Sequence, residues 1–419
     1  MFPGLFWVRI PTWLAIFWRK YLAPPQEPTE KLIPGSAIIF RLDQLGDVVL
    51  TTPLFRELKR HYPSAHCTVV VRPEYREILT TNPNVDEILV LRSVNAKWLP
   101  AGLRCLLSAW RFYRTALSGR RFDLAISPRW DVDDSLATML CTLTDAAQRV
   151  GYTSKTSPSK AAINRGFDAA FDVLLPSGPC RHEVERNLAI VEALGGGVGS
   201  RALDIRVTER DRSFARELLT NHDNRRRLIA IGIGGRAGGR KWPLRNYAEC
   251  IRRLDKQRSV QPLIVCSADE DSEAVELSAM LPVSPYVLSG LPLRRVCAVL
   301  QRCHVFIGND SGAAHLAAAM DCPVVVVSRH PMDGDASHAN SPVRFGPWCR
   351  RSRVLQPPSG EGGCKAACRS LEPHCILQVT IEQVVKAVHE LLPIEESVPP
   401  AIEVPMRDEL HLVGITGPA

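Results

Sequence analysis

The sequence lacks several features that would place a protein in a well-known class. It has no run of basic residues interleaved with aromatics, which argues against nucleic acid as a partner. The apolar run Trp13–Trp18 is too short to span a bilayer, and no internal repeat is found. The net charge of +8 is modest and compatible with an anionic substrate or a membrane surface. What remains is the composition of an ordinary globular protein, with 419 residues that predict two domains.

The N-terminal segment Met1–Tyr21 also lacks the marks of a secretory signal, because it has no basic start and no small-residue cleavage site. It is rich in tryptophan and phenylalanine, with Arg9, Arg19 and Lys20 nearby. That composition suits a helix lying in a membrane interface, outside both domain cores. Packing on its own domain, or an incorrectly assigned start codon, are the alternatives.

The thirteen cysteines are mostly scattered through apolar stretches, where they are expected to be reduced core residues. One cluster differs: Cys364, Cys368 and Cys375 lie close in sequence, with His374 adjacent and Cys349 upstream. Three cysteines and a histidine are a ligand set for zinc. The spacing is not that of a standard zinc finger, and the sequence favours reduced thiols in a cytosolic chain without a bound metal.

Apolar runs and helical periodicity alternate along the chain. Strands are expected at 37–40, 67–71, 87–91, 124–127, 228–233, 263–266, 305–308 and 323–327. Helices are expected at 99–118, 183–194, 244–255, 273–280, 293–301, 313–320 and 381–392. This alternation predicts an α/β fold with parallel sheets and right-handed crossovers.

The composition and the positions of proline and glycine residues predict four parts of the chain. Residues 1–35 hold the aromatic and basic segment and a proline-rich linker, and residues 36–224 form a first α/β domain. Residues 225–392 form a second α/β domain, and 393–419 form a disordered tail with little periodicity.

Three motifs carry chemistry. The segment Ile38–Leu54 is a buried strand, a glycine turn and a helix, which places Asp47 at the carboxyl edge of a sheet, where open α/β sheets bind ligands. An aspartate there either accepts a proton or caps the helix. The segment Val305–Met320 repeats this arrangement, and its helix N-terminus suits a phosphate. Between them, the strand at 228–233 runs into a cationic, glycine-rich loop that ends at Lys241.

In this order and spacing the motifs resemble glycosyltransferase family 9, the lipopolysaccharide heptosyltransferase group. The matching segments are Arg41–Pro53, Arg149–Tyr152, His182–Leu188, Lys241–Pro243 and Gly308–Leu316, within about 36–392. The resemblance implies the GT-B architecture: two Rossmann-like domains with parallel sheets that face each other across a cleft. It also implies an acceptor site in the first domain, a nucleotide-sugar site in the second, and a last helix that crosses back to the first domain.

The resemblance also assigns roles to residues. Asp47 corresponds to the catalytic base, and Lys241 to the lysine that meets the donor phosphate. The donor signature corresponds to Asp310, Ser311, Gly312 and His315. Its serine and glycine N–H groups hold phosphate, the aspartate orients the loop or meets a sugar hydroxyl, and the histidine either donates to phosphate or is structural.

Other acidic residues remain open. Asp43, where many members of the family have serine, is either a second carboxylate or a turn residue. Glu270 is the candidate for binding the donor ribose, with Asp271 nearly as good. The pair Asp133-Asp134 is interpreted as loop or helix-capping residues and not as a metal site.

The function implied is inverting, metal-independent and cofactor-free transfer of heptose, or a related sugar, from an ADP-sugar to the inner core of lipopolysaccharide. The partners implied are a nucleotide-sugar donor, a lipid-linked anionic saccharide acceptor and the inner-leaflet membrane surface. The location implied is cytoplasmic, or peripheral on the cytoplasmic face of the inner membrane. The alternatives are a family 9 transferase that uses another nucleotide sugar, and a non-catalytic GT-B binding protein.

Overall fold

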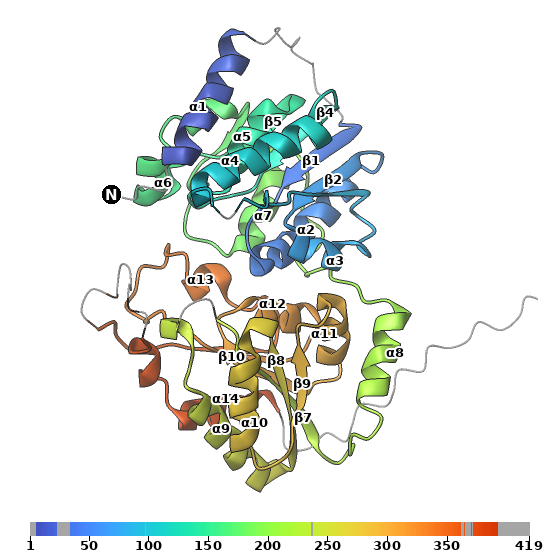
Figure 1. Ribbon diagram of the computed structural model, residues 1–419, viewed down its shortest axis with the longest axis vertical. Coiled ribbons are helices and arrows are strands. Elements are labelled where there is room, and N and C mark those ends of the chain that lie inside the picture. Colours follow the sequence, from blue (N-terminus) through green and yellow to red (C-terminus); the bar gives the residue numbers. More distant parts are fainter. Residues whose placement is uncertain are drawn as a thin grey trace, which may run out of the picture.

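Two parallel β-sheets of six strands each form the framework of the chain (Figure 1). The computed structural model describes residues 6–22, 34–96, 98–235, 238–361, 364, 370 and 372–392, and the account below refers to these. The expected proline-rich linker and the expected disordered tail fall at 23–33 and 393–419, which lie outside the described residues. The predicted α/β fold with two parallel sheets is confirmed.

The first sheet has the order β3-β2-β1-β4-β5-β6. Its strands are β1 (Ser36–Phe40), β2 (His66–Val71), β3 (Glu87–Val90), β4 (Arg121–Ser127), β5 (Asp145–Tyr152) and β6 (Val173–Leu175). The helices of this first unit are α1 (Phe6–Tyr21), α2 (Leu45–His61), α3 (Arg76–Leu79), α4 (Ala101–Phe112), α5 (Ala137–Leu143), α6 (Pro158–Ile163) and α7 (Glu183–Ala193).

The second sheet has the order β12-β11-β10-β7-β8-β9. Its strands are β7 (Arg227–Gly232), β8 (Val260–Cys266), β9 (Tyr286–Ser289), β10 (Val305–Asn309), β11 (Val324–Val327) and β12 (Ser352–Leu355). The helices of this second unit are α8 (Glu209–Leu218), α9 (Leu244–Arg258), α10 (Asp271–Met280), α11 (Leu293–Leu300), α12 (Gly312–Ala319), α13 (Pro342–Phe345) and α14 (Ile381–Leu391).

The central strands are almost continuous apolar runs because helices cover both faces of a parallel sheet. All four valines of β11 are buried, as are the last four residues of β1. The eight expected strands are all present. The sequence missed β6, β9 and β12, which are short, half-buried strands near or at sheet edges, and β5, whose apolar run is interrupted by polar residues.

Two helices lie on a different unit from the one expected. The last helix, α14, packs on α9, β11 and β12 of the second unit, so the expectation that it crosses back to the first domain is wrong. Helix α8 packs against α11, also in the second unit. We therefore place the boundary between the two units before α8 and not at residue 225.

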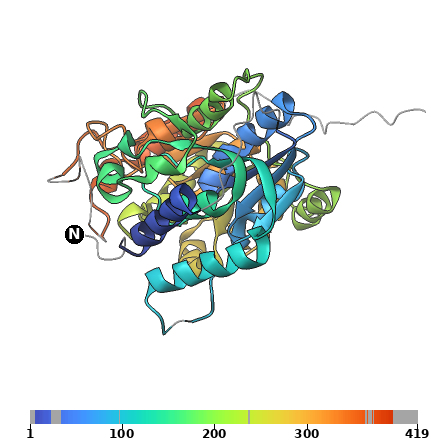
Figure 2. The same ribbon diagram turned by 90° about the horizontal axis from the view of Figure 1, so that it is seen from above.

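Helix α1 packs on the first unit, so the expectation that this segment lies outside both cores is wrong. Val8 and Ala15 are buried in a cluster with β1 and α5, and the Trp13 indole donates to the carbonyl of Arg165 at 2.8 Å. Seen from above in Figure 2, α1 lies on the near side of the molecule. No helix among the described residues is long and apolar enough to cross a membrane.

The outer face of α1 is nevertheless apolar and exposed. The large apolar side chains of this face recur at helical spacing and are each between 39% and 63% exposed: Trp7, Ile10, Trp13, Leu14, Phe17, Trp18 and Tyr21. One face of the helix is therefore anchored on the protein, while the other faces solvent.

Candidate active site

The N-termini of α2 and α12 meet between the two sheets. Each follows the carboxyl end of a central strand, β1 in one unit and β10 in the other. A Cβ at Gly46 would lie 2.7 Å from Cδ2 of His315, and a Cβ at Gly312 would lie 2.8 Å from Cδ2 of Leu45. Because only glycine permits such a close approach, the two glycine turns allow the N-termini of α2 and α12 to touch.

Asp47 lies in the first turn of α2 and is 18% exposed. Its Oδ2 accepts the backbone N–H of Gln44 at 3.1 Å, and its Oδ1 lies 3.9 Å from the Arg41 guanidinium. Burial raises the pKa of Asp47, the nearby Arg41 opposes the rise, and the carboxylate of Glu183 adds to it. The residue thus caps the helix with one oxygen and has a raised proton affinity, as a general base requires.

Asp43 is buried and cannot serve as an exposed second carboxylate. Its side chain is 2% exposed, accepts a hydrogen bond from Arg41 at 2.9 Å, and forms an ion pair with Arg129. Asp43 therefore fixes the guanidinium of Arg41, which in turn lies beside Asp47.

On the opposite side, Lys241 follows the glycine-rich loop and pairs with two glutamates. Its Nζ lies 3.0 Å from Oε1 of Glu270 and 2.8 Å from each carboxylate oxygen of Glu273. Burial alone would lower the pKa of Lys241, but these hydrogen bonds outweigh it and raise the pKa. Glu270 also accepts the N–H of Gly235 at 3.2 Å. Asp271, the alternative, instead accepts from the hydroxyl of a β9 serine.

Asn309, at the end of β10, holds the loop and the lysine in place. Its amide nitrogen donates to the carbonyls of Ile233 and Gly234, at 3.1 and 3.2 Å. Its amide oxygen accepts the N–H of Trp242 at 2.8 Å and the Tyr247 hydroxyl at 2.9 Å. One fully buried side chain therefore links the ends of β7 and β10 to the start of α9.

The turn Asp310–Gly312 and the following His315 are called the donor turn after their expected role. The donor turn has two polar atoms that are buried and lack a hydrogen-bond partner in the described part of the chain: Ser311 Oγ and His315 Nδ1. An unsatisfied hydroxyl at a helix N-terminus is suited to a phosphate oxygen. Burial lowers the pKa of His315 to about 4, so this imidazole is neutral near pH 7. Burial raises the pKa of Asp310 to about 6, opposed by the charges of Arg240 and Arg329. Arg240 belongs to the cationic loop that the sequence indicated, whereas Arg329 lies outside every motif and was not predicted.

A buried ionic cluster next to Asp47 joins the two units and was also missed. Arg344 of α13 is completely buried and binds Asp131 at 2.7 Å and Glu183 at 2.6 Å, both in the first unit. Arg186 binds the same glutamate at 2.6 Å, and both guanidiniums lie over the Trp130 ring. The His182–Leu188 motif pointed to half of this cluster, whereas no local signal marks Arg344.

Asp133 caps α5, accepting the backbone N–H of Thr138 at 2.7 Å and of Ala137 at 3.3 Å. Asp134 lies 3.5 Å from Arg129. The capping interpretation of Asp133 is confirmed, and its carboxylate is occupied by backbone donors.

Comparison with known proteins agrees with this arrangement. The profile of glycosyltransferase family 9 (heptosyltransferase) matches residues 110–366, a span that includes Lys241 and the donor turn but not Asp47. The lipopolysaccharide core heptosyltransferase OpsX of Haemophilus influenzae is 22% identical over 77% of this chain and 84% of its own length.

Solved structures share the fold. A family 9 glycosyltransferase from Veillonella parvula superposes with a TM-score of 0.66 at 20% identity, covering 85% of this chain and 96% of its own. The E. coli heptosyltransferase WaaC with ADP gives a TM-score of 0.62 at 20% identity, covering 85% and 99%. The two facing units are thus a GT-B architecture.

The family profile covers more than half of the 419 residues, and the turn at Gly312 within that span contacts the turn at Gly46, which precedes it. This chain is a glycosyltransferase and belongs to family 9, the heptosyltransferase family.

Proposed function

We propose that the chain transfers a heptose from an ADP-heptose to the inner core of lipopolysaccharide, with inversion and without a metal in the chemistry. The relatives named for lipopolysaccharide heptosyl transfer support this substrate class, and WaaC holds ADP. The observation that carries the proposal is the contact of the two glycine turns, which sets Asp47 opposite the unsatisfied donor turn.

In the proposed reaction, Asp47 accepts the proton of an acceptor hydroxyl as its oxygen attacks the anomeric carbon. The bond from that carbon to the ADP oxygen breaks on the opposite side, which inverts the configuration. The negative charge that develops on the diphosphate meets the N-terminus of α12 and the Ser311 hydroxyl. In-line attack requires the base to lie on the acceptor side, opposite the leaving diphosphate. Asp47 meets this requirement, because it lies in the first unit, to which acceptor binding is assigned.

Donor binding requires Lys241 to change partners. Its ammonium lies between two carboxylates, of which Glu273 is the more exposed, at 35% against 13% for Glu270. We expect phosphate oxygens to replace Glu273, because an ammonium with three donors can keep Glu270 and bind phosphate at once. Glu270 stays in place beside the glycine loop, where it is available to a ribose hydroxyl.

The exposed face of α1 suits a membrane surface that presents the lipid-linked acceptor. The helix has no acidic residue, and Arg9 and Lys20 lie over the exposed rings of Trp13 and Tyr21, whereas Arg19 pairs with Asp172 of the first unit. Helix α4 packs beside it and carries the exposed Trp110. Aromatic and cationic side chains on one helix face are typical of interfacial binding.

The test is the variant Asp47→Asn, assayed for ADP release from ADP-heptose with a delipidated inner-core acceptor. Loss of a general base costs ~10²–10⁴-fold in rate. ADP affinity should stay unchanged, because the substitution keeps the shape of the side chain. The matched control, Asp134→Asn, removes an exposed carboxylate of the same unit and should behave as wild type.

Near-normal turnover by Asp47→Asn would reject this residue as the base. If the wild-type protein binds ADP but turns over no nucleotide sugar, it is a non-catalytic binding protein. Turnover of a different nucleotide sugar, with the product mass to match, would replace heptose as the donor sugar.

A further inference from the structure

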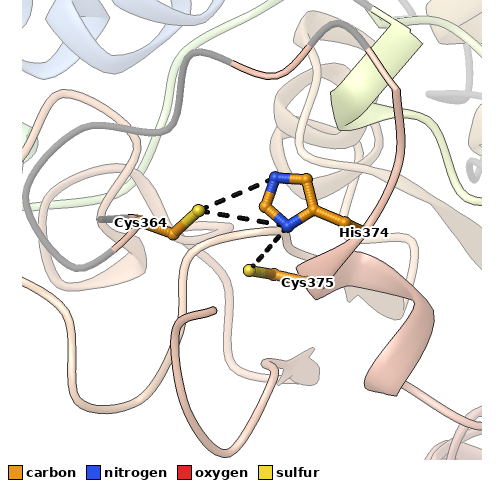
Figure 3. Close-up of side chains that lie close together, drawn as sticks. All are labelled: Cys364, His374 and Cys375. Atoms are coloured by element: carbon orange, nitrogen blue, oxygen red, sulfur yellow. Dashed lines mark hydrogen bonds between the residues drawn. The ribbon is translucent and has the colours of Figure 1, made fainter. Parts of the chain in front are cut away.

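Three side chains with metal-binding atoms converge at the start of the short helix η9 (Cys375–Gln378), far from the catalytic turns in sequence. They are Cys364, His374 and Cys375, and their ligand atoms all lie within 4.8 Å of one another. Figure 3 shows both sulfurs facing the imidazole. The Cys364 sulfur lies 3.7 Å from Nε2 and 3.9 Å from Nδ1, and the Cys375 sulfur lies 3.0 Å from Nδ1.

These distances match those between the ligands of one metal ion. With Zn–S of about 2.3 Å and Zn–N of about 2.0–2.1 Å, tetrahedral geometry separates sulfur from nitrogen by roughly 3.5 Å. The two sulfur-to-Nδ1 distances, 3.0 and 3.9 Å, lie on either side of that value. Small adjustments of the side chains would therefore bring Nδ1 and both sulfurs onto a common ion.

A backbone donor and a carboxylate flank the cluster. The backbone N–H of Glu361 donates to the Cys375 sulfur at 3.3 Å, and its carboxylate lies 3.8 Å from His374 Nδ1. Such contacts around the ligands orient them. Cys375 is only 3% exposed and precedes the fully buried Ile376, so one ligand is fixed to the core of the second unit.

The cluster also lies next to the donor loop. A Cβ at Gly239 would lie 2.6 Å from the carbonyl oxygen of Ser370 and 3.2 Å from that of Glu372. Gly239 belongs to the turn η6 (Gly238–Arg240) immediately before Lys241. Ser370 and Glu372, which lie between the cysteines in sequence, therefore pack against the turn that precedes the proposed phosphate-binding lysine, Lys241.

We propose that Cys364, His374 and Cys375 bind a zinc-class divalent metal ion, which holds Ser370 and Glu372 against the donor turn. Binding converts two thiols to thiolates and releases two protons, the imidazole stays neutral and binds through Nδ1, and a water molecule completes the four-coordinate shell. The resulting site has no net charge, in keeping with its partly buried position. The role is structural, so the sugar-transfer chemistry remains metal-free. Cys368 lies outside the described residues and is not needed for the argument.

The experiment measures metal content in the full-length protein purified from zinc-supplemented medium. Elemental analysis should find about one zinc per chain, as expected for one structural site. Replacement by Co²⁺ should give the visible absorption of tetrahedral, thiolate-bound cobalt. Cys364→Ser and His374→Ala should lose both signals. The control Cys349→Ser removes a thiol of the same unit outside the cluster and should keep both.

Chelation of the wild-type protein should lower its melting temperature and weaken ADP binding, and the cluster variants should show the same loss without chelator. Cys364→Ser changes a partly exposed position, so the test remains decisive if variants of the buried Cys375 fail to fold. A metal-free protein without a cobalt spectrum would overturn the proposal and leave a hydrogen-bonded thiol cluster. Metal retained in both cluster variants would overturn it too, because the ion would then bind elsewhere. Unchanged ADP affinity after metal removal would overturn the supporting role.

Discussion

Arg344→Met should weaken the junction of the two units and alter the pH dependence of catalysis. The guanidinium is completely buried and binds Asp131 through two hydrogen bonds, of 2.7 and 3.0 Å, and Glu183 through two, of 2.6 and 3.0 Å. Methionine keeps much of the volume over the Trp130 ring but removes the charge. Both carboxylates then lose their shared partner from the other unit.

The expected loss of stability depends on the ion-pair partners that Asp131 and Glu183 keep without Arg344. Removing one partner of a buried ion pair costs ~3–5 kcal/mol. Glu183 still has Arg186 at 2.6 Å, so the lower end, about 3 kcal/mol, is expected. For a unit of about 150–250 residues, 1 kcal/mol lowers the melting temperature by roughly 2–4 °C, so we expect a drop of roughly 6–12 °C.

The pH effect has a definite sign. Asp47 must be ionised to act as a base, and burial already raises its pKa, with Glu183 and Asp131 adding to the rise. Without Arg344 the negative charges of these two residues are less compensated, so the pKa of Asp47 should rise further. The acidic limb of the kcat/KM profile should then move to higher pH, because activity appears only above the pKa of the base.

The assay is ADP release from pH 5 to 9, together with thermal unfolding, for wild type, Arg344→Met and the control Arg294→Met. Arg294 also joins the units, lying 3.6 Å from Glu77, but it does not contribute to the pKa of Asp47. The control should therefore lower stability without moving the acidic limb. A wild-type melting temperature and pH profile for Arg344→Met would refute the reasoning. If the acidic limb of the kcat/KM profile shifted equally in both variants, the cause would be a weakened junction between the units and not the loss of a charge near Asp47.

Lys241→Ala should weaken ADP binding and slow transfer, because the ammonium compensates the negative charge that grows on the leaving diphosphate. If the calorimetric ADP affinity and the transfer rate both stayed unchanged, Lys241 would be only a surface residue. Gly312→Ala should lower kcat/KM roughly 10–100-fold, because its Cβ would lie 2.8 Å from a side chain of α2 and force the two helices apart. Gly197→Ala, whose Cβ would meet nothing within 4 Å, is the silent control. The double change Leu14→Glu and Phe17→Glu should cut binding to anionic vesicles at least about tenfold, since each apolar side chain is worth ~1.5–3 kcal/mol when fully buried. Both are more than half exposed, so the melting temperature should not change, and equal vesicle binding would exclude α1 as the contact.

The sequence by itself determined the two parallel sheets and the sheet edges at which the ligand sites are predicted. Buried parallel strands are mostly apolar, so β1, β7, β10 and β11 stand out as apolar runs rich in isoleucine and valine. The polar residues that follow such strands lie at one sheet edge, and the resemblance to family 9 then indicated Asp47, Lys241 and the donor turn among them. Their roles as base and phosphate ligands remain predictions.

Tertiary structure alone decided which surfaces meet. Periodicity shows that one face of a helix is buried but does not name its partner, so α14 was expected on the first unit and α1 outside both cores. The same limit hid Arg344, because the role of a single arginine in a short helix becomes visible only when Asp131 and Glu183, more than 150 positions away, are seen to surround it. Cys364 and His374 illustrate it again: sequence spacing allowed a metal site, but only distances between folded side chains distinguish a ligand set from scattered thiols. Local sequence constrains the local backbone, whereas the energies of charge pairing and coordination depend on separations that only the packed chain defines.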